Sequence, residues 1–185
     1  AVLFEGLLGV MGDTGLEEIT YAAAAKAKLT SFDKVTGGWL GFTDKYWLAA
    51  MIPDQAAEMD LNFRRPKGAQ DHYQADYALH DAQTAAPGGD ATIQTHLFVG
   101  AKVLSLLDRY ETQYAIPKFD KAVNFGWSAP LSEPMFYAID WLKAGLWGNF
   151  GLAIMAFTLF VKILFFPLAN YSYRSMSRMK LLAPK

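Results

Sequence analysis

Short apolar runs separated by turn-forming residues occupy the first two thirds of the chain. The runs cover residues 2–4, 7–11, 39–42, 46–52, 75–79 and 92–99. The stretches 12–15, 65–68 and 86–90, rich in Gly, Pro and Asp, punctuate them. Apolar runs of this length with such punctuation are typical of β-strands. They predict a mainly β fold, an antiparallel β-sandwich over residues 1–125, in which the alanine-rich patch 21–28 is either a helical turn or a loop.

One segment within this region has a helical period instead. Residues 101–114 place Val103, Leu106, Leu107 and Tyr110 on one face of a helix.

The pattern changes after Gly126. Apolar residues recur there at three- or four-residue spacing, namely Leu131, Met135, Ile139, Leu142 and Leu146. This spacing predicts an amphipathic helix, with Ser132 as its N-cap and Pro134 tolerated in its first turn.

Tryptophans crowd the same stretch, which we assign to residues 126–148. A tryptophan ring is apolar while its N–H seeks water, so the residue suits the surface of a bilayer. We expect an interfacial helix whose membrane-contacting residues are Trp127, Met135, Trp141 and Trp147. A surface helix packed on the sandwich is the alternative.

The next segment is long enough to cross a membrane. We assign the span to residues 149–169, in which residues 151–169 form an apolar run with Lys162 as its one charge, close to the roughly 20 residues that a bilayer core requires. The basic residues Arg174, Arg178 and Lys180 follow without a compensating acid. The positive-inside bias predicts that residues 170–185 are cytoplasmic and residues 1–125 are outside. A buried helix of a soluble protein would have to explain both this length and the one-sided charge.

Composition supports a chain whose ends lie in different surroundings. Hydrophobic residues make up 52% of its 185 residues, enough to bury a core. Residues 1–120 carry 16 acidic and 10 basic side chains, whereas residues 141–185 carry six basic ones and no acid. The sequence has no cysteine, which excludes disulfides and cysteine nucleophiles. The missing initiator Met and a basic tail that still has a helical pattern indicate a fragment of a longer protein.

Lys162 is the residue most suggestive of function. A cation near the middle of a span costs about 2.5–3.5 kcal/mol on insertion scales, so it normally faces protein or water. Thr158, Lys162, Phe165 and Tyr173 share one helix face, with Ala169 between them, and we predict that this face lines a substrate groove. Snorkelling to the headgroups is the alternative. It would have to span about 12 Å along the helix to reach the level of residue 170.

Other candidate chemistry is weak. His72, His80 and His96 do not form a helical ligand pair, so we predict no metal site. Gly88 and Gly89 belong to a turn rather than to a phosphate-binding loop. Arg174, Arg178 and Lys180 suit orientation and contact with anionic lipid better than a specific nucleic-acid site. We expect no catalytic residue and no cofactor.

Several motifs together resemble the YidC/Oxa insertase family. In the sandwich they are Gly37-Gly38-Trp39-Leu40, the run 46–53 and Thr95-His96-Leu97-Phe98-Val99-Gly100. After it they are Phe125-Gly126-Trp127, Ser132-Glu133-Pro134-Met135-Phe136, the run 148–151, Phe165-Phe166-Pro167-Leu168, Tyr173-Arg174-Ser175-Met176 and the run 179–185. The resemblance covers the whole chain and is most specific after Phe125.

This resemblance implies a non-enzymatic membrane insertase and chaperone of the bacterial inner membrane. The family integrates nascent transmembrane segments, alone or with the Sec translocon, without nucleotide or metal. Its periplasmic domain is a large β-sandwich similar to mutarotase folds, a supersandwich of which this chain would hold the C-terminal portion. Its partners would be nascent membrane proteins, the Sec translocon, membrane lipids and the ribosome, the last through regions outside this chain.

The resemblance also assigns the end of the chain. The family core has five transmembrane helices around a hydrophilic groove, and residues 149–169 would be the first of them. Residues 170–185 would begin a cytoplasmic helical hairpin. Lys162 falls where the family usually carries an arginine. Lysine keeps the charge but loses the planar fork that binds a carboxylate with two hydrogen bonds.

Two other functions remain open on the residues alone. The first is a membrane-anchored β-sandwich that binds a carbohydrate, in which the helix is only a tether. A sugar site needs an aromatic platform with clustered polar groups, and the sequence does not reveal one in residues 1–120. The second is a mutarotase, which would require a histidine and a carboxylate that we cannot pair from the sequence.

Overall fold

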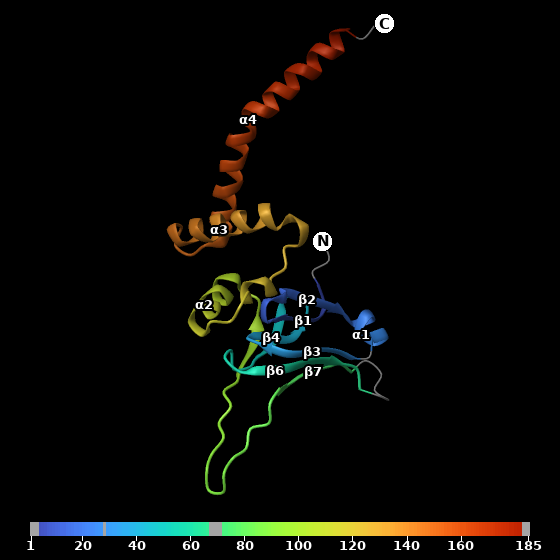
Figure 1. The fold of residues 1–185 in the computed structure, drawn as a ribbon. Helices are drawn as coiled ribbons and strands as arrows, with labels where there is room; N and C mark the ends of the chain where they lie inside the picture. Colours follow the sequence, from blue (N-terminus) through green and yellow to red (C-terminus); the bar gives the residue numbers. More distant parts are fainter. Residues whose placement is uncertain (1–3, 28, 67–71, 183–185) are drawn as a thin grey trace. The chain divides into compact units, whose positions relative to one another are not determined.

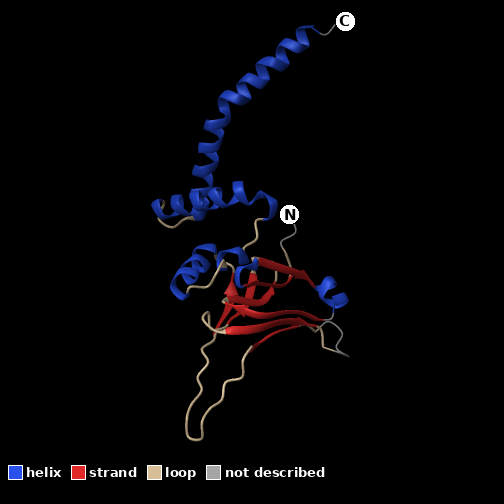
Figure 2. Cartoon of the chain, viewed as in Figure 1, coloured by secondary structure: helices blue, strands red, loops and turns tan. Residues whose placement is uncertain are grey.

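The computed structural model describes residues 4–27, 29–66 and 72–182, without the side chains of Trp127 and residues 174–182. The chain divides into two compact units, residues 1–124 and residues 125–185. The first unit is a β-sandwich with helices, and the second is helical (Figures 1 and 2).

Two antiparallel sheets make up the first unit. The five-stranded sheet has the order β2-β1-β4-β5-β8, and the three-stranded sheet has the order β3-β6-β7. The strands of the wider sheet are β1 (Gly6–Met11), β2 (Leu16–Thr20), β4 (Gly38–Thr43), β5 (Trp47–Ile52) and β8 (His96–Ala101). Those of the narrower sheet are β3 (Leu29–Thr36), β6 (Glu58–Arg64) and β7 (Gln74–Leu79).

The wider sheet is the middle of three layers. On one face it packs against α2 (Leu104–Tyr114) and the short 3-10 helix η2 (Phe119–Ala122), and on the other against the three-stranded sheet (Figure 1). Trp39 anchors the first interface, where its ring meets Phe119 edge-on with centroids 5.2 Å apart. Its indole Nε1 donates a hydrogen bond of 3.1 Å to the Pro117 carbonyl. Leu7, Leu40 and Leu61 fill the second interface.

A close backbone approach explains one glycine of the middle layer. Gly38 begins β4 with a φ of +118°, a conformation that L side chains rarely adopt. A Cβ at this position would lie 2.0 Å from the Val10 carbonyl oxygen on the neighbouring strand β1. The pairing of β1 with β4 therefore requires glycine here.

The sequence predicted part of this sandwich correctly. The runs 7–11, 39–42, 46–52 and 75–79 are confirmed as β1, β4, β5 and β7, and the patch 21–28 contains a helix, α1 (Tyr21–Ala27). The run 92–99 is only partly right, because β8 begins at His96. The run 2–4 lies outside the described residues except for Phe4, which is not in a strand. Strands β2, β3 and β6 were missed.

The predicted helix 101–114 needs a correction at its start. Ala101 ends β8, and Val103 has an extended φ of −95° that makes it the N-cap of α2. Val103 is 47% exposed, so it is not part of the packing face. Leu104 and Leu107 are the buried residues of this helix.

The second unit contains a short 3-10 helix, η3 (Gly126–Ser128), and two long helices, α3 (Ala129–Gly145) and α4 (Phe150–Leu182). The predicted N-cap Ser132 is wrong, because α3 begins three residues earlier. Pro130 occupies its first turn. Ser132 donates a hydrogen bond of 3.1 Å to the Ser128 hydroxyl, and Pro134 lies inside the helix.

Helix α4 is continuous over 33 residues and extends beyond the predicted span 149–169. Its continuation to Leu182 agrees with the helical pattern of the basic tail. Pro167 lies within it. Because proline has no backbone N–H, the amide that would normally donate to the Ile163 carbonyl is absent.

Candidate membrane-embedded site

Helix α4 contains a segment suited to cross a bilayer. Phe150–Tyr173 spans 24 residues, and an 18-residue window within it has a mean hydropathy of 2.3. At about 1.5 Å per residue the whole segment is roughly 36 Å long, which exceeds the ~30 Å hydrocarbon core of a bilayer. Only 6% of that window is buried, whereas the core helix of a soluble protein would bury most of it.

The start of this span is fixed by a helix cap. The Asn149 side-chain oxygen accepts hydrogen bonds from the backbone N–H of Gly151, at 2.9 Å, and of Leu152, at 3.2 Å. Both donors belong to the first turn, which otherwise has no intrahelical partner for them. The sequence reasoning missed Asn149. An asparagine directly after Gly148 and before the apolar run was the available signal.

A tight turn joins α3 to α4. Trp147 has a φ of +51° and Gly148 a φ of +73°. The Lys143 carbonyl accepts hydrogen bonds from the N–H groups of Leu146 and Gly148, at 3.1 and 3.0 Å. Positive φ is costly for a bulky residue such as tryptophan, and these bonds hold it there. The turn leaves Trp147 92% exposed.

The predicted groove residues share one face of α4. Thr158, Lys162, Phe165 and Tyr173 are all exposed, and the Thr158 hydroxyl donates a hydrogen bond of 2.7 Å to the Ile154 carbonyl. The Lys162 side chain forms no ion pair with any described residue. The structure thus shows that these four residues lie exposed on one face of α4, and the groove stays a prediction.

Of the four predicted interface residues, Met135, Trp141 and Trp147 have described side chains. On α3, Met135 and Trp141 are 39% and 76% exposed. Lys143 is 3.6 Å from Asp140, and its ammonium lies 4.4 Å from the centroid of the Phe150 ring. The interfacial position of α3 remains a prediction.

Four predicted residues lie beyond the described side chains. They are Trp127, Arg174, Arg178 and Lys180. The backbone of the three basic residues continues helix α4, whereas Trp127 belongs to the short helix η3.

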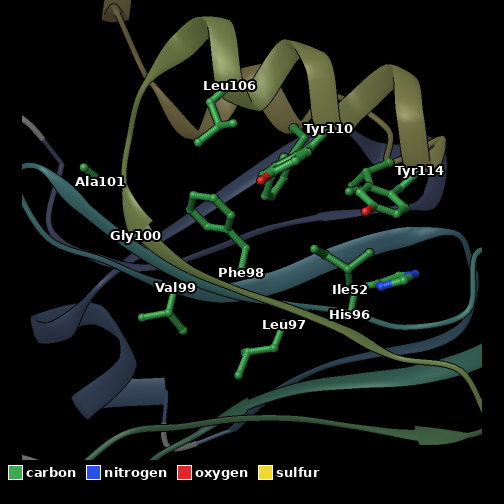
Figure 3. A pocket seen from close by; sticks show the side chains of 12 residues that line it. Ile52, His96, Leu97, Phe98, Val99, Gly100, Ala101, Leu106, Tyr110 and Tyr114 are labelled. Atoms are coloured by element: carbon green, nitrogen blue, oxygen red, sulfur yellow. The ribbon is translucent and has the colours of Figure 1, made fainter.

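The sandwich also has a cavity, of about 420 Å³, between β8 and α2 (Figure 3). Four rings come together here, those of His96, Phe98, Tyr110 and Tyr114. The ring centroids of His96 and Tyr114 are 4.8 Å apart. The sandwich therefore has an aromatic cluster, although the sequence did not reveal one in residues 1–120. Its polar side chains are His96 and two tyrosine hydroxyls, so it lacks the clustered charged and amide groups of a sugar site.

The other histidines occupy surface positions. His80 Nδ1 lies 2.8 Å from Asp60 Oδ1, and this hydrogen bond raises the pKa of His80 above 6.5. The pKa of Asp60 is lowered, first by a hydrogen bond from the backbone N–H of Lys34 and then by His80. A histidine and a carboxylate thus do pair, contrary to the sequence expectation, but both are on the outer face of the sandwich. His72 lies beside Tyr73 at a shallow pocket.

Metal ligands do not gather elsewhere in the described ranges. No group of three or more His, Asp or Glu side chains within residues 4–27, 29–66 and 72–182 is arranged to hold an ion. A partly buried lysine, Lys102, donates a hydrogen bond of 2.9 Å to the Thr43 hydroxyl, and burial lowers its pKa.

Two family models together match nearly the entire chain. The model described as the YidC periplasmic domain matches residues 1–138, and the model described as the 60Kd inner membrane protein matches residues 141–185. The boundary between them falls in α3, after the sandwich and before the apolar span.

Curated relatives align with the whole chain. Proteins from Granulibacter bethesdensis, Brucella suis and Rhizobium meliloti are 52%, 48% and 44% identical to it, over 100% of its length. Each is named membrane protein insertase YidC. The chain covers 32%, 30% and 31% of those proteins, so it spans about a third of their length. With the sandwich, the exposed span and both family models in agreement, the chain belongs to the YidC family of membrane protein insertases.

Proposed function

We propose that this chain is part of an insertase and chaperone that integrates nascent transmembrane segments into the bacterial inner membrane. The observation that carries this proposal is the identity of 44–52% over the whole chain to proteins named membrane protein insertase YidC. The exposed apolar span of α4 supports it. The activity is non-covalent, and the partners are nascent membrane proteins, membrane lipids, the Sec translocon and, through regions outside this chain, the ribosome.

In this proposal, the positive charge of Lys162 attracts the polar flank of the substrate. A polar flank of a nascent segment is costly to carry through hydrocarbon. A groove that holds water and a cation lowers that cost, most of all for an acidic flank, because screening is weak there. Thr158, Phe165 and Tyr173 would contact the same flank, and the apolar part of the substrate would then move along α4 into lipid.

The orientation of the chain belongs to the same proposal. The sandwich lies in the periplasm, and the basic end of α4 is cytoplasmic, because uncompensated Arg and Lys residues favour the cytoplasmic side. Helix α3 lies along the periplasmic surface of the bilayer, and its exposed Met135 and Trp141 contact that surface. Trp147 marks the depth at which the span begins, and Trp127 lies at the same surface.

Single cysteines test the orientation. Gly89→Cys and Ser177→Cys, made separately in a full-length protein without other cysteines, should react with an impermeant maleimide from opposite sides of the inner membrane. Reaction of both variants in intact spheroplasts would contradict the orientation.

Substitution of Lys162 tests the function. Lys162→Arg in the full-length protein should retain insertion, Lys162→Glu should impair it, and Lys162→Ala should be intermediate with the largest loss for substrates with acidic flanks. The measurement is protease protection of a single-spanning reporter in cells depleted of the native insertase, with variant abundance followed by immunoblot.

A swap provides a matched control. The double variant Lys162→Phe with Phe160→Lys keeps the composition of α4 but moves the cation to the far side of the helix. It should insert poorly, as Lys162→Glu does. Normal insertion by the Glu variant and by the swap, at normal abundance, would show that charge on this face is irrelevant. In that case α4 would be only a tether.

A further inference from the structure

One side of α4 packs against α3 near the start of the span. Of the described side chains in the second unit, Ala153 is the one hydrophobic residue that is fully buried. Ala156 and Phe157, one turn later, are half-buried, whereas Ile154 and Met155 are exposed. Helix α3 lies across the first turns of α4 and covers them (Figure 1). The side of α4 that carries Ala153 is therefore the side that contacts α3.

Short-range contacts hold this arrangement in place. The methyl group of Ala153 is small enough to let the two helices approach closely. Lys143, in the last turn of α3, accepts two backbone hydrogen bonds from the turn that follows, and its ammonium lies 4.4 Å from the centroid of the Phe150 ring in the first turn of α4. We call residues 129–157, which these contacts hold together, the corner.

The corner fixes the direction in which Lys162 points. Lys162 follows Ala153 by nine residues, which is about two and a half turns at roughly 3.6 residues per turn. It therefore lies on the side of α4 opposite α3. Thr158 and Phe165 lie within about 60° of the same side. The face predicted to line the groove is thus the face that α3 leaves open.

The corner also fixes the depth of Lys162. At about 1.5 Å per residue, Lys162 lies about 13 Å further along α4 than Ala153. The hydrocarbon core of a bilayer is ~30 Å thick, so its middle is about 15 Å from either surface. With α3 along the periplasmic surface, contact at Ala153 places Lys162 close to the middle of the bilayer, for a helix near the membrane normal.

We propose that α3 positions Lys162 for insertion, with Ala153 as the positioning residue that sets its depth and its direction. This inference rests on the insertase function and on the surface position of α3 proposed above. Rotation about the axis of α4 would turn the cation from a wet groove toward lipid or toward α3, where a charge is costly. The contact at Ala153 opposes that rotation.

A spin label in place of Lys162 reports its surroundings. Lys162→Cys is made in the full-length protein, with any other cysteine replaced, and the labelled protein is reconstituted into lipid vesicles. Relaxation of the label by oxygen, which concentrates in lipid, is divided by relaxation by a nickel chelate, which stays in water. Ala153→Leu forces α3 away from α4 and should change this ratio at least about twofold, because the label exchanges one solvent for the other. Ala153→Ser keeps a small side chain and should retain the parent ratio.

A change of helical phase tests the same idea without enlarging Ala153. One alanine inserted between Phe157 and Thr158 turns the label by about 100° relative to α3 and should change the ratio. Deleting Val161 as well restores the spacing of nine residues from Ala153 and should restore the ratio. If helices outside this chain set the position of residue 162, the insertion alone would leave the ratio unchanged.

An unchanged ratio in both Ala153→Leu and the insertion variant would overturn the proposal. If Ala153→Leu does not integrate, the insertion variant decides. Insertion of a reporter protein is not part of this readout. Normal insertion by Lys162→Glu with a responsive ratio would count against the function alone, whereas impaired insertion with an unresponsive ratio would count against the positioning alone.

Discussion

Residues 1–124 and residues 125–185 are both rich in apolar side chains, but they place them differently. The sandwich buries Trp39, Leu40 and Phe119 completely. In the helical unit, Ala153 is the buried hydrophobic residue among the described side chains, while Trp141 and Phe166 are 76% and 67% exposed. Water explains the first arrangement, because it drives apolar surface inward. The second arrangement is stable only if the surrounding solvent is itself apolar, as in a bilayer.

Removing one tryptophan from each unit should have very different effects. Trp39→Ala deletes a fully buried ring and leaves the Pro117 carbonyl without its donor, so the sandwich should lose about 3–5 kcal/mol of stability. Trp141→Ala should leave the sandwich unchanged. Hydrogen exchange of the β1 and β4 amides in the full-length protein measures both effects. Similar protection of the β1 and β4 amides in the two variants would contradict this expected difference between the two units.

A charge on the exposed surface of α4 should cost more than a charge on a water-exposed helix. Leu159 is 60% exposed. If α4 crosses the bilayer, Leu159→Arg should lower the efficiency of membrane integration by about 2.5–3.5 kcal/mol. A glycosylation-site reporter in microsomes measures the integrated fraction. Leu159→Met is the control, and equal integration of the Arg and Met variants would place this surface in water.

The cap of α4 should have a smaller effect. Asn149→Ala removes the acceptor of the Gly151 and Leu152 amides and should destabilise the first turn by about 1 kcal/mol. Faster hydrogen exchange at these two amides is the expected result. Asn149→Asp keeps an acceptor and should exchange like the parent, so fast exchange in both variants would argue against capping as the cause.

The smallest effect is expected from the exposed pair of His80 and Asp60. The pKa of His80 is raised, so its contribution to stability is complete below 6.5 and is lost as pH rises through the raised value. The pKa of Asp60 is lowered, so its contribution is present above 3.8 and is lost as pH falls through the lowered value. Between these limits the pair is most stabilising.

Thermal unfolding at several pH values measures this contribution. The Tm of the parent should fall relative to that of His80→Asn as pH rises above 6.5. His72→Asn serves as the control for loss of an imidazole elsewhere in the sandwich. A difference in Tm between the parent and His80→Asn that does not change with pH would exclude titration of this pair as its cause.

The sequence predicted the strands of the middle sheet better than those of the outer sheet, for a physical reason. A strand covered on both faces is a nearly continuous apolar run, and β1 and β4 were found in this way. Strand β6 has one face in water and alternates, with Met59, Leu61 and Phe63 buried, so a search for runs passes over it. Period-two alternation was the signal that would have found it.

The candidate site was predictable only as far as one helix allows. Spacing places Thr158, Lys162, Phe165 and Tyr173 on a single face, and the structure has them there. The walls that would face them cannot follow from this sequence, because they depend on other helices. The cap at Asn149 and the left-handed turn at Trp147 are set by hydrogen bonds between residues close in sequence, but no apolar period encodes them.

Pro167 gives α4 a preferred place to bend. In an unbroken helix each degree of bending strains hydrogen bonds on the convex side, whereas the turn at Pro167 has one fewer bond to strain. A mismatch between the length of the span and the thickness of the bilayer is therefore absorbed at this turn, as a change in the tilt of one half of the helix relative to the other. Pro167→Ala restores the amide and stiffens the helix, which spin-label distances across the turn would register as a narrower distribution.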